Sequence, residues 1–577
     1  MENTVAYMQD VIRRIHTHDR WFSYSENQKT IALVENLMRE LGMVQVETLR
    51  FPSDGITKHN GWLMPLCWEA QKGTLELLLP DGEKQLICSY EQDPCSLMMY
   101  SHPADVDAEL ALPEDDDVKG KIVLFVHKNL SMDVVLEYLE RGAVGFISAL
   151  VGGAQVGQAG FEYLDDVYQW CHYRLPLWEV PQKPFGFSIS PRKGRYLENM
   201  LKSGKPVKVH ACLKTTLFQG TIPFVTGVLP GESEEEILLT GHLFEEGAND
   251  NASGVAECLA IIRSLSGKKR KRSIRLAFTN EARSFQAYLN NVKELPPIIA
   301  GINVDMVGCN LDDRGWIQDT DVVFPNFTVS LLEHCLKKQN LSAGILHYPD
   351  NDTGLFERGV PMTLVEFVND ANYHKSSDTP DKISPEFIAR TFTAVREFTE
   401  ILVNAGSRDA AFLAEIVSAY EREKSHFTGR ETPRFACQRA RKRLDSILRL
   451  VPLEEQNKTA ELLEKYKEQF GKEETFAAAE YAGILSGFPK RLEHGLFSFE
   501  RYIDRKKEYP ETASLIRGWV AQDWVHHILA WSDGSRSTAE IMQLLCEAGF
   551  EIEVKLFNAL LEFMISEGYM CMCSGRE

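Results

Sequence analysis

The sequence lacks any run of about 18 consecutive apolar residues, the minimum for a membrane-spanning helix. Its first residues, MENTVAYMQDVIRRIHTHDR, also lack the apolar stretch of a secretory signal peptide. No internal repeat is visible along the 577 residues. We therefore expect a cytoplasmic protein with no membrane partner, and the length predicts about three to four domains.

Positive charge is in deficit. The chain has 63 Lys and Arg against 83 Asp and Glu, so its formal net charge is −20 at pH 7. Because negative charge repels phosphate groups, we expect no nucleic acid as the main partner. The same charge is compatible with binding metal cations and the amino terminus of a peptide.

Closely spaced cysteines are almost absent. The twelve cysteines are scattered, and most lie among apolar residues, as Cys212, Cys258 and Cys335 do. This pattern is typical of reduced, buried thiols in a cytosolic protein. The exception is the pair Cys571 and Cys573, a weak signal for metal or redox chemistry.

Hydrophobic patterning divides the chain into regions. Residues 1–52 read as helical and then extended, and residues 53–215 as a β-rich insert. Strands and helices alternate over residues 216–405, which we interpret as the catalytic domain. Alternation of this kind predicts an α/β fold, a largely parallel mixed sheet with helices on both faces.

The C-terminal part is read as a charged helical linker over residues 406–510 and a winged-helix-like module over residues 511–577. From Leu515 onward, four basic residues stand against nine acidic ones. Such a module is poorly suited to DNA, so we expect it to pack or dimerise. A homo-oligomer could form through this module or through the insert.

Five potential ligands or bases each follow a predicted strand of the α/β region. The strands are predicted at Ile237–Thr240, Ser273–Phe278, Ile298–Asn303 and Met362–Phe367, and the polar residues that follow them are His242, Asp250, Glu281, Asp305 and His374. Functional groups of a parallel sheet gather beyond the carboxyl ends of its strands. We therefore expect these side chains to lie together.

Their chemistry is that of a zinc site. Imidazoles and carboxylates are zinc ligands, and one carboxylate can bridge two ions. A bound water can then be activated if a free carboxylate accepts its proton. Manganese or cobalt would also be accepted by a carboxylate-rich site.

The motifs GHLFEEGANDNASGVAECLA, TNEA, NVDMVG and YHKSSDTPDK resemble the co-catalytic di-zinc aminopeptidase superfamily. That group includes leucyl aminopeptidases, glutamate carboxypeptidase II and transferrin-receptor relatives. Residues 118–150 similarly resemble the protease-associated domain that this superfamily often carries as an insert. The resemblance covers residues 1–405 and implies a zinc-exopeptidase fold, a peptide substrate and one or two zinc ions.

The resemblance also implies individual roles. Asp250 would bridge two ions, His242 and Asp305 would hold one of them, and His374 would hold the other. The segment PDNDTGLFERGVP resembles the family's segment before the last ligand, where Asp350 or Asp352 and Phe356 would match.

The chain departs from the family pattern after the second strand, where relatives usually have two glutamates, first the base and then a ligand. Counting from Phe278 makes Glu281 the general base and places Ala282 at the ligand position. A shift by one residue would place Asn280 at the base position and make Glu281 the ligand. We prefer the first count because it keeps a proton acceptor, although it leaves the ion at His374 one ligand short.

A second departure is Phe244, where the family often has an aspartate that orients the first histidine. Glu245 and Glu246 follow it and could replace that aspartate as an outer partner or serve as a ligand. The favoured interpretation is that both are exposed loop acids.

Two functions are predicted from these residues. The first is a zinc-dependent aminopeptidase that removes the N-terminal residue of peptides, with Glu281 as general base. The second is a catalytically silent binding protein that keeps the fold and one metal. A related amide hydrolase or cyclase is a third alternative.

Overall fold

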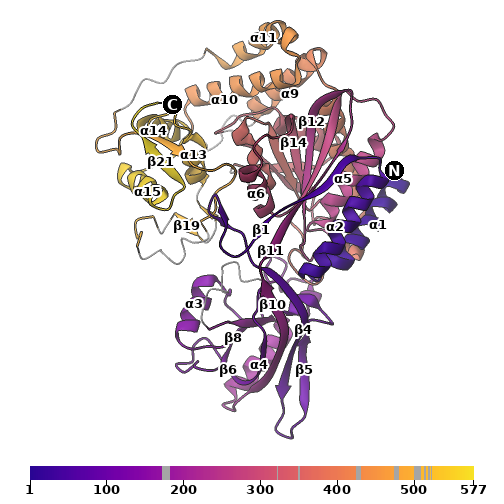
Figure 1. Ribbon diagram of the computed structural model, residues 1–577, viewed down its shortest axis with the longest axis vertical. Helices are drawn as coiled ribbons and strands as arrows, with labels where there is room; N and C mark the ends of the chain where they lie inside the picture. Colours follow the sequence, from indigo (N-terminus) through magenta and orange to yellow (C-terminus); the bar gives the residue numbers. More distant parts are fainter. Residues whose placement is uncertain are drawn as a thin grey trace.

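The structure is a computed structural model. It describes residues 1–171, 182–320, 322–347, 351–423, 430–472, 480–499, 508–512, 515–517, 520–521 and 523–576. Figure 1 shows a large α/β domain, a second sheet below it, and a C-terminal group of helices at its side. None of the helices in the described ranges is both long enough and apolar enough to cross a membrane.

The α/β domain is built on an eight-stranded mixed sheet with the strand order β1-β11-β13-β12-β14-β17-β15-β16. Its strands are β1 Val44–Ser53, β11 Gly220–Leu229, β12 Ser233–Leu243, β13 Arg272–Asn280, β14 Ile298–Val304, β15 Arg314–Gln318, β16 Ser342–Leu346 and β17 Met362–Glu366. The central strands β13, β12, β14 and β17 run parallel to one another. The four predicted strands therefore form the middle of the sheet, and the predicted fold class is confirmed.

Helices cover both faces of this sheet (Figure 1). One face packs against α1 Glu2–Asp19, α2 Tyr24–Glu40, α5 Ala252–Leu265, α7 Thr328–Lys338 and α8 Pro385–Asn404. The other face packs against α6 Arg283–Asn291 through an apolar group that includes Phe224, Phe285 and Tyr288. Burial on both faces explains why the central strands read as nearly continuous apolar runs.

Helix α5 begins directly at the loop that carries Asp250. Asn251 caps it by accepting a hydrogen bond from the N–H of Gly254 at 3.1 Å. A Cβ at Gly254 would lie 2.3 Å from the carbonyl oxygen of Val304, which ends β14. Glycine is therefore required for the first turn of α5 to approach the sheet this closely.

The second sheet lies within the predicted insert and has the order β5-β4-β10-β6-β7-β8-β9. Its strands are β4 Cys67–Leu78, β5 Lys84–Ser89, β6 Ala104–Ala111, β7 Ile122–Phe125, β8 Gly145–Ser148, β9 Phe185–Ser188 and β10 Lys208–Phe218, with α3 Met132–Glu140 and α4 Pro191–Lys202 beside them. Residues 118–150 form the expected strand, helix and strand. Assignment of this unit as a protease-associated domain stays a prediction.

The C-terminal part consists of α9 Ala410–Glu423, α10 Pro433–Asp445 and α11 Leu453–Lys467, followed by α13 Asp523–Trp531, α14 Thr538–Glu547 and α15 Val554–Ser566. Strand β21, Met570–Cys573, pairs with β18, Phe488–Arg491. The C-terminal module therefore draws on residues before the predicted boundary at 511. Its likeness to a winged helix stays a prediction.

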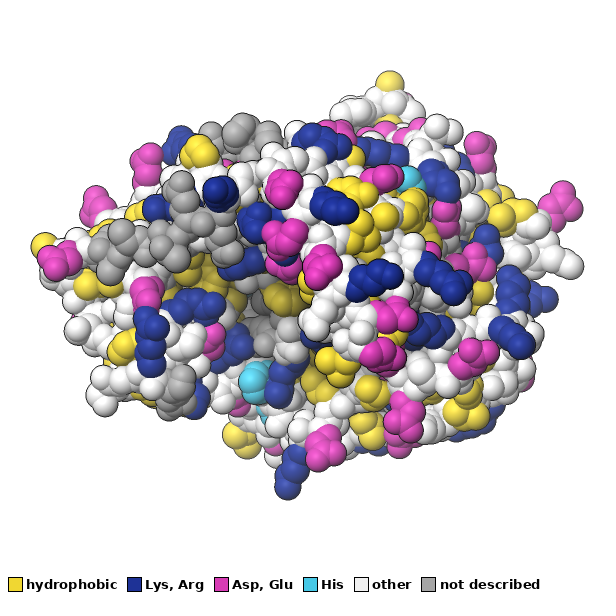
Figure 2. Space-filling view, turned by 90° about the horizontal axis from the view of Figure 1, so that it is seen from above, with side chains coloured by type: hydrophobic (Ala, Val, Ile, Leu, Met, Phe, Trp, Pro, Cys, Tyr) yellow, Lys and Arg dark blue, Asp and Glu magenta, His cyan; other side chains and the backbone are white. Residues whose placement is uncertain are grey.

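The surface charge is mixed. On the face seen in Figure 2, basic and acidic side chains are interspersed, so on this face the negative charge of the chain is not gathered into one patch.

Candidate metal centre

The predicted ligands come from loops at the carboxyl edge of the central sheet. His242 lies at the end of β12, Asp305 follows β14, and His374 lies in the loop after β17. Asp250 precedes α5, and Glu281 lies between β13 and α6. Because β12, β13, β14 and β17 are parallel neighbours, their carboxyl ends bring these loops to one place.

Asp250 stands between the two histidines. Its Oδ1 is 3.4 Å from Nε2 of His242, and its Oδ2 is 3.1 Å from Nε2 of His374. Asp305 approaches His242 from another side, with Oδ2 at 3.4 Å from the same Nε2. His242, Asp250 and Asp305 are buried. Each histidine thus directs one ring nitrogen toward one oxygen of the same carboxylate.

Glu245 and Glu246 are not exposed loop acids, which corrects the favoured interpretation. Glu245 exposes 9 % of its surface and Glu246 exposes 3 %. Oε2 of Glu245 lies 3.3 Å from Nε2 of His374. Neither carboxylate oxygen of Glu246 has a hydrogen-bond partner among the described residues. The sequence did not reveal this burial, because the burial depends on the path of the loop after β12, which carries both glutamates.

Phe244 sets the path of that loop. Its φ of 74° lies in the left-handed region, and its N–H donates to Oδ2 of Asp19 at 2.9 Å. Asp19 belongs to α1 and also accepts the hydroxyl of Thr30 from α2. Burial raises the pKa of Asp19 to about 7. The N-terminal helices therefore anchor the residue that precedes Glu245.

Glu281 is half-buried beside these groups. Burial raises the pKa of Glu245 and of Asp305, and the negative charge of Glu281 adds to both shifts, so Glu281 lies near the centre. Ala282 instead belongs to the apolar group on the α6 side of the sheet, with Phe285. Asp350 lies outside the described residues, and only the backbone of Asp352 and Phe356 is described, in the 3-10 helix Asn351–Arg358.

The electrostatics are those of a site built for cations. Burial alone would lower the pKa of His242 and His374, but the neighbouring carboxylates raise both well above the ordinary value. Burial and repulsion from Asp250 and Glu281 raise the pKa of Glu245 to about 8. Asp305 Oδ1 and His242 Nδ1 are buried with no hydrogen-bond partner among the described residues. Concentrated carboxylates of this kind need protons or a metal ion to be stable.

Residues that the sequence analysis did not single out hold the loops that carry Asp250 and His374. The carboxylate of Asp378 accepts the N–H of Asn249 at 2.8 Å and of Asp250 at 3.1 Å. The insert contributes as well, because the N–H of Trp170 and the amide of Gln169 both donate to the carbonyl oxygen of His374, at 2.8 and 2.7 Å. The motif YHKSSDTPDK contains Asp378, but no sequence signal marks Trp170.

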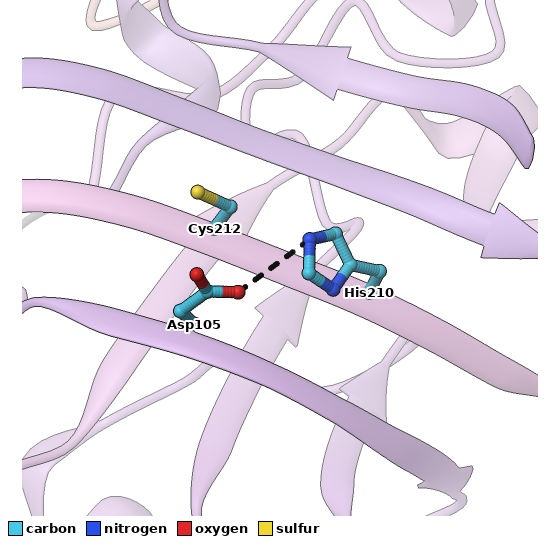
Figure 3. A group of neighbouring side chains, drawn as sticks. All are labelled: Asp105, His210 and Cys212. Carbon is cyan, nitrogen blue, oxygen red and sulfur yellow. Dashed lines mark ion pairs between the residues drawn. The ribbon is translucent and has the colours of Figure 1, made fainter.

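A second group of potential ligands lies on the insert sheet, where Figure 3 shows Asp105, His210 and Cys212. Nε2 of His210 is 3.6 Å from Oδ1 of Asp105, and its Nδ1 is 2.8 Å from Oδ1 of Asp107. Both aspartates are exposed. This group lies on β6 and β10 and belongs to a different sheet from the centre.

Comparison with known families decides what kind of domain this edge belongs to. Residues 225–399, which include His242, Asp250, Glu281, Asp305 and His374, match Peptidase family M28. The chain contains an M28 peptidase domain. The predicted resemblance to this group of metallopeptidases is confirmed for the matched domain.

Solved structures share its fold. The zinc aminopeptidase BSAP from Bacillus subtilis aligns with a TM-score of 0.50 at 17% identity, covering 69% of this chain and 95% of that chain. A Clostridium acetobutylicum protein proposed to be a peptidase aligns with a TM-score of 0.50 at 15% identity, covering 99% of this chain and 97% of that chain. No curated protein matches the sequence. The fold of 69% of this chain is therefore similar to that of BSAP, and the fold of nearly the whole chain is similar to that of the clostridial protein.

Proposed function

We propose that the protein is a zinc-dependent aminopeptidase that hydrolyses the N-terminal residue of peptides. His242 and Asp305 would hold one ion, His374 would hold a second, and Asp250 would bridge the two. The observation that carries this proposal is the position of Asp250, whose two oxygens lie 3.4 and 3.1 Å from the two histidine nitrogens. Two ligands of one tetrahedral zinc ion stand about 3.4 Å apart, so these separations suit zinc.

Zinc, when bound, would acidify a water molecule and polarise the scissile carbonyl group. Proton transfer is then the task of a side chain of the protein. Glu281 accepts the proton of the attacking water and passes it to the departing amine, as a general base that becomes a general acid. Glu281 suits this task because it is half-buried at the edge of the centre and therefore reachable by substrate.

The preference for an N-terminal residue would follow from charge. Five carboxylates, those of Asp250, Asp305, Glu245, Glu246 and Glu281, surround two imidazoles, so two bound zinc ions would still leave one negative charge in excess. A free ammonium group beside the scissile bond is attracted to such a site, whereas a peptide without one lacks this attraction.

One observation favours a second candidate function, a catalytically silent binding protein. The loop after β13 carries only Glu281 where the family pattern has two glutamates, since Ala282 packs into the apolar group. If Glu281 were occupied as a ligand, the centre would have no base at this loop.

Hydrolysis of aminoacyl-p-nitroanilides by the parent and by Glu281→Gln distinguishes the two. We expect zinc-dependent turnover in the parent and a loss of about 10²- to 10⁴-fold in kcat for Glu281→Gln, with bound zinc retained. Glu294→Gln, at an exposed position after α6, is the matched control and should keep parent activity. Equal, metal-independent background in all three proteins would reject the enzyme.

A further inference from the structure

We propose that Glu245 is the missing ligand of the second ion, held between His374 and Asp250. It would replace, from a different loop, the glutamate that the family pattern places at the position of Ala282. This inference rests on the proposed metal centre and assigns a residue to it.

The contacts of His374 carry the assignment. Nε2 of His374 is 3.1 Å from Asp250 Oδ2 and 3.3 Å from Glu245 Oε2. The contacts of His242 repeat this arrangement, with Asp250 Oδ1 and Asp305 Oδ2 each at 3.4 Å. Glu245 therefore lies beside Nε2 of His374 in the same way that Asp305 lies beside Nε2 of His242. Both triads consist of one imidazole, one terminal carboxylate and one oxygen of the shared Asp250.

The position of Ala282 cannot supply this ligand. Its side chain packs with Phe285 and other apolar residues on the α6 side of the sheet. The loop between β13 and α6 is short, and Ala282 itself occupies the left-handed region with a φ of 56° before α6 begins at Arg283. The glutamate lost from this loop is thus recovered from the loop after β12.

Glu246 is the neighbouring alternative, and the geometry does not favour it. Potential ligand atoms of Glu245, Asp250 and His242 lie within 4.8 Å of one another, so Glu245 reaches the shared carboxylate of Asp250 as well as His374. Glu246 makes no ion pair with either histidine within the described residues. The N–H of Phe244 is anchored by Asp19, and the next residue, Glu245, brings its Oε2 to 3.3 Å from Nε2 of His374.

The assignment has a mechanistic consequence. With Glu245 as the ligand, Glu281 is not needed to hold the second ion and is free to accept a proton. The two tasks that the family pattern gives to adjacent glutamates are then divided between two loops.

Zinc binding, measured by equilibrium titration and by metal analysis of the full-length protein, tests the assignment without reference to catalysis. All proteins carry His210→Ala, which removes the insert group as a source of extra zinc. We expect two ions in this background. In Glu245→Gln the second ion should bind at least about 10- to 100-fold more weakly, because removal of even an outer partner has that effect.

Two further variants make the result specific. Glu246→Gln changes the adjacent buried glutamate and should retain both ions. Glu245→His keeps a zinc ligand at the same position and should restore the second ion. Circular dichroism of each variant establishes that it is folded.

The assignment is overturned if Glu245→Gln binds two ions as tightly as the background protein. It is equally overturned if Glu246→Gln loses the second ion instead, or if the background protein binds only one. These results are separate from those for the proposed function. Loss of the second ion in Glu245→Gln together with full activity of Glu281→Gln would uphold Glu245 as a ligand and reject Glu281 as the base.

Discussion

The carboxylates of the candidate metal centre differ in the groups that they contact. Asp250, Asp305 and Glu245 face histidine nitrogens, whereas Asp378 faces backbone and fixes the loop that carries Asp250. Gly247 makes room for it, since a Cβ there would lie 2.1 Å from Oδ2 of Asp378. Asp378 therefore positions Asp250, the proposed bridging ligand, through its backbone.

Replacement of Asp378 by alanine should weaken zinc binding by about 10- to 100-fold, because the loop that presents Asp250 loses both backbone anchors. Zinc titration measures this effect. Asp381→Ala, at an exposed carboxylate three residues away, is the control and should bind zinc as the parent does. Parent affinity in Asp378→Ala would show that the loop holds its shape without this carboxylate.

At the scale of elements, the insert is part of the site and not only a neighbour of it. Its segment Tyr168–Trp170 runs beside the loop that carries His374, with the Tyr168 carbonyl accepting the N–H of Ser376 and the Trp170 N–H donating to His374. The Trp170 ring meets the His374 ring edge-on, with centroids 5.2 Å apart. Two elements that are about 200 residues apart in the chain thus orient His374.

Trp170→Ala should therefore weaken the ion at His374 by about 10-fold or more, since the ring packing that orients this ligand is lost. The backbone hydrogen bond to His374 is retained, so the variant isolates the ring. Tyr163→Phe, which removes only the hydroxyl bond to Asn372, is the matched control. Unchanged zinc affinity in Trp170→Ala would confine the role of the insert to its backbone contacts.

At the scale of the whole molecule, buried ion pairs join the C-terminal helices to the α/β domain. Arg443 of α10 is almost fully buried and pairs with Asp319, just beyond β15, at 2.9 Å and with Glu421 of α9 at 2.5 Å. It also donates to the carbonyl oxygen of Asn326 at 2.7 Å. The helices over residues 407–470 are thereby part of the core packing and not a loose linker.

Arg443→Met should lower the free energy of unfolding by about 3–5 kcal/mol, because it leaves two buried carboxylates without this cation. Urea unfolding followed by circular dichroism measures the change. Arg441→Met removes a pair with the half-exposed Glu464 and should cost less than about 1 kcal/mol. Similar losses in both variants would contradict the special role of the buried arginine.

The sequence alone was sufficient for the central sheet and for the expectation that His242, Asp250, Glu281, Asp305 and His374 gather at one edge of it. The apolar runs before His242, Glu281 and Asp305 predicted parallel strands, and parallel strands bring their carboxyl ends to one edge whatever surrounds them. This rule is local and topological, so it needs no knowledge of packing. The helix from Pro385 was equally readable, since Ser384 caps it by accepting the N–H of Phe387 at 3.2 Å.

Only the tertiary structure decided which further side chains reach the proposed ligands. Glu245 reads as a loop acid until Asp19 of α1 anchors Phe244 and turns the next residue inward. Trp170 reaches His374 because a separate sheet packs beside the domain, and Arg443 is buried because three distant segments meet. Such contacts depend on how remote surfaces fit together, which periodicity and residue spacing along the chain do not encode.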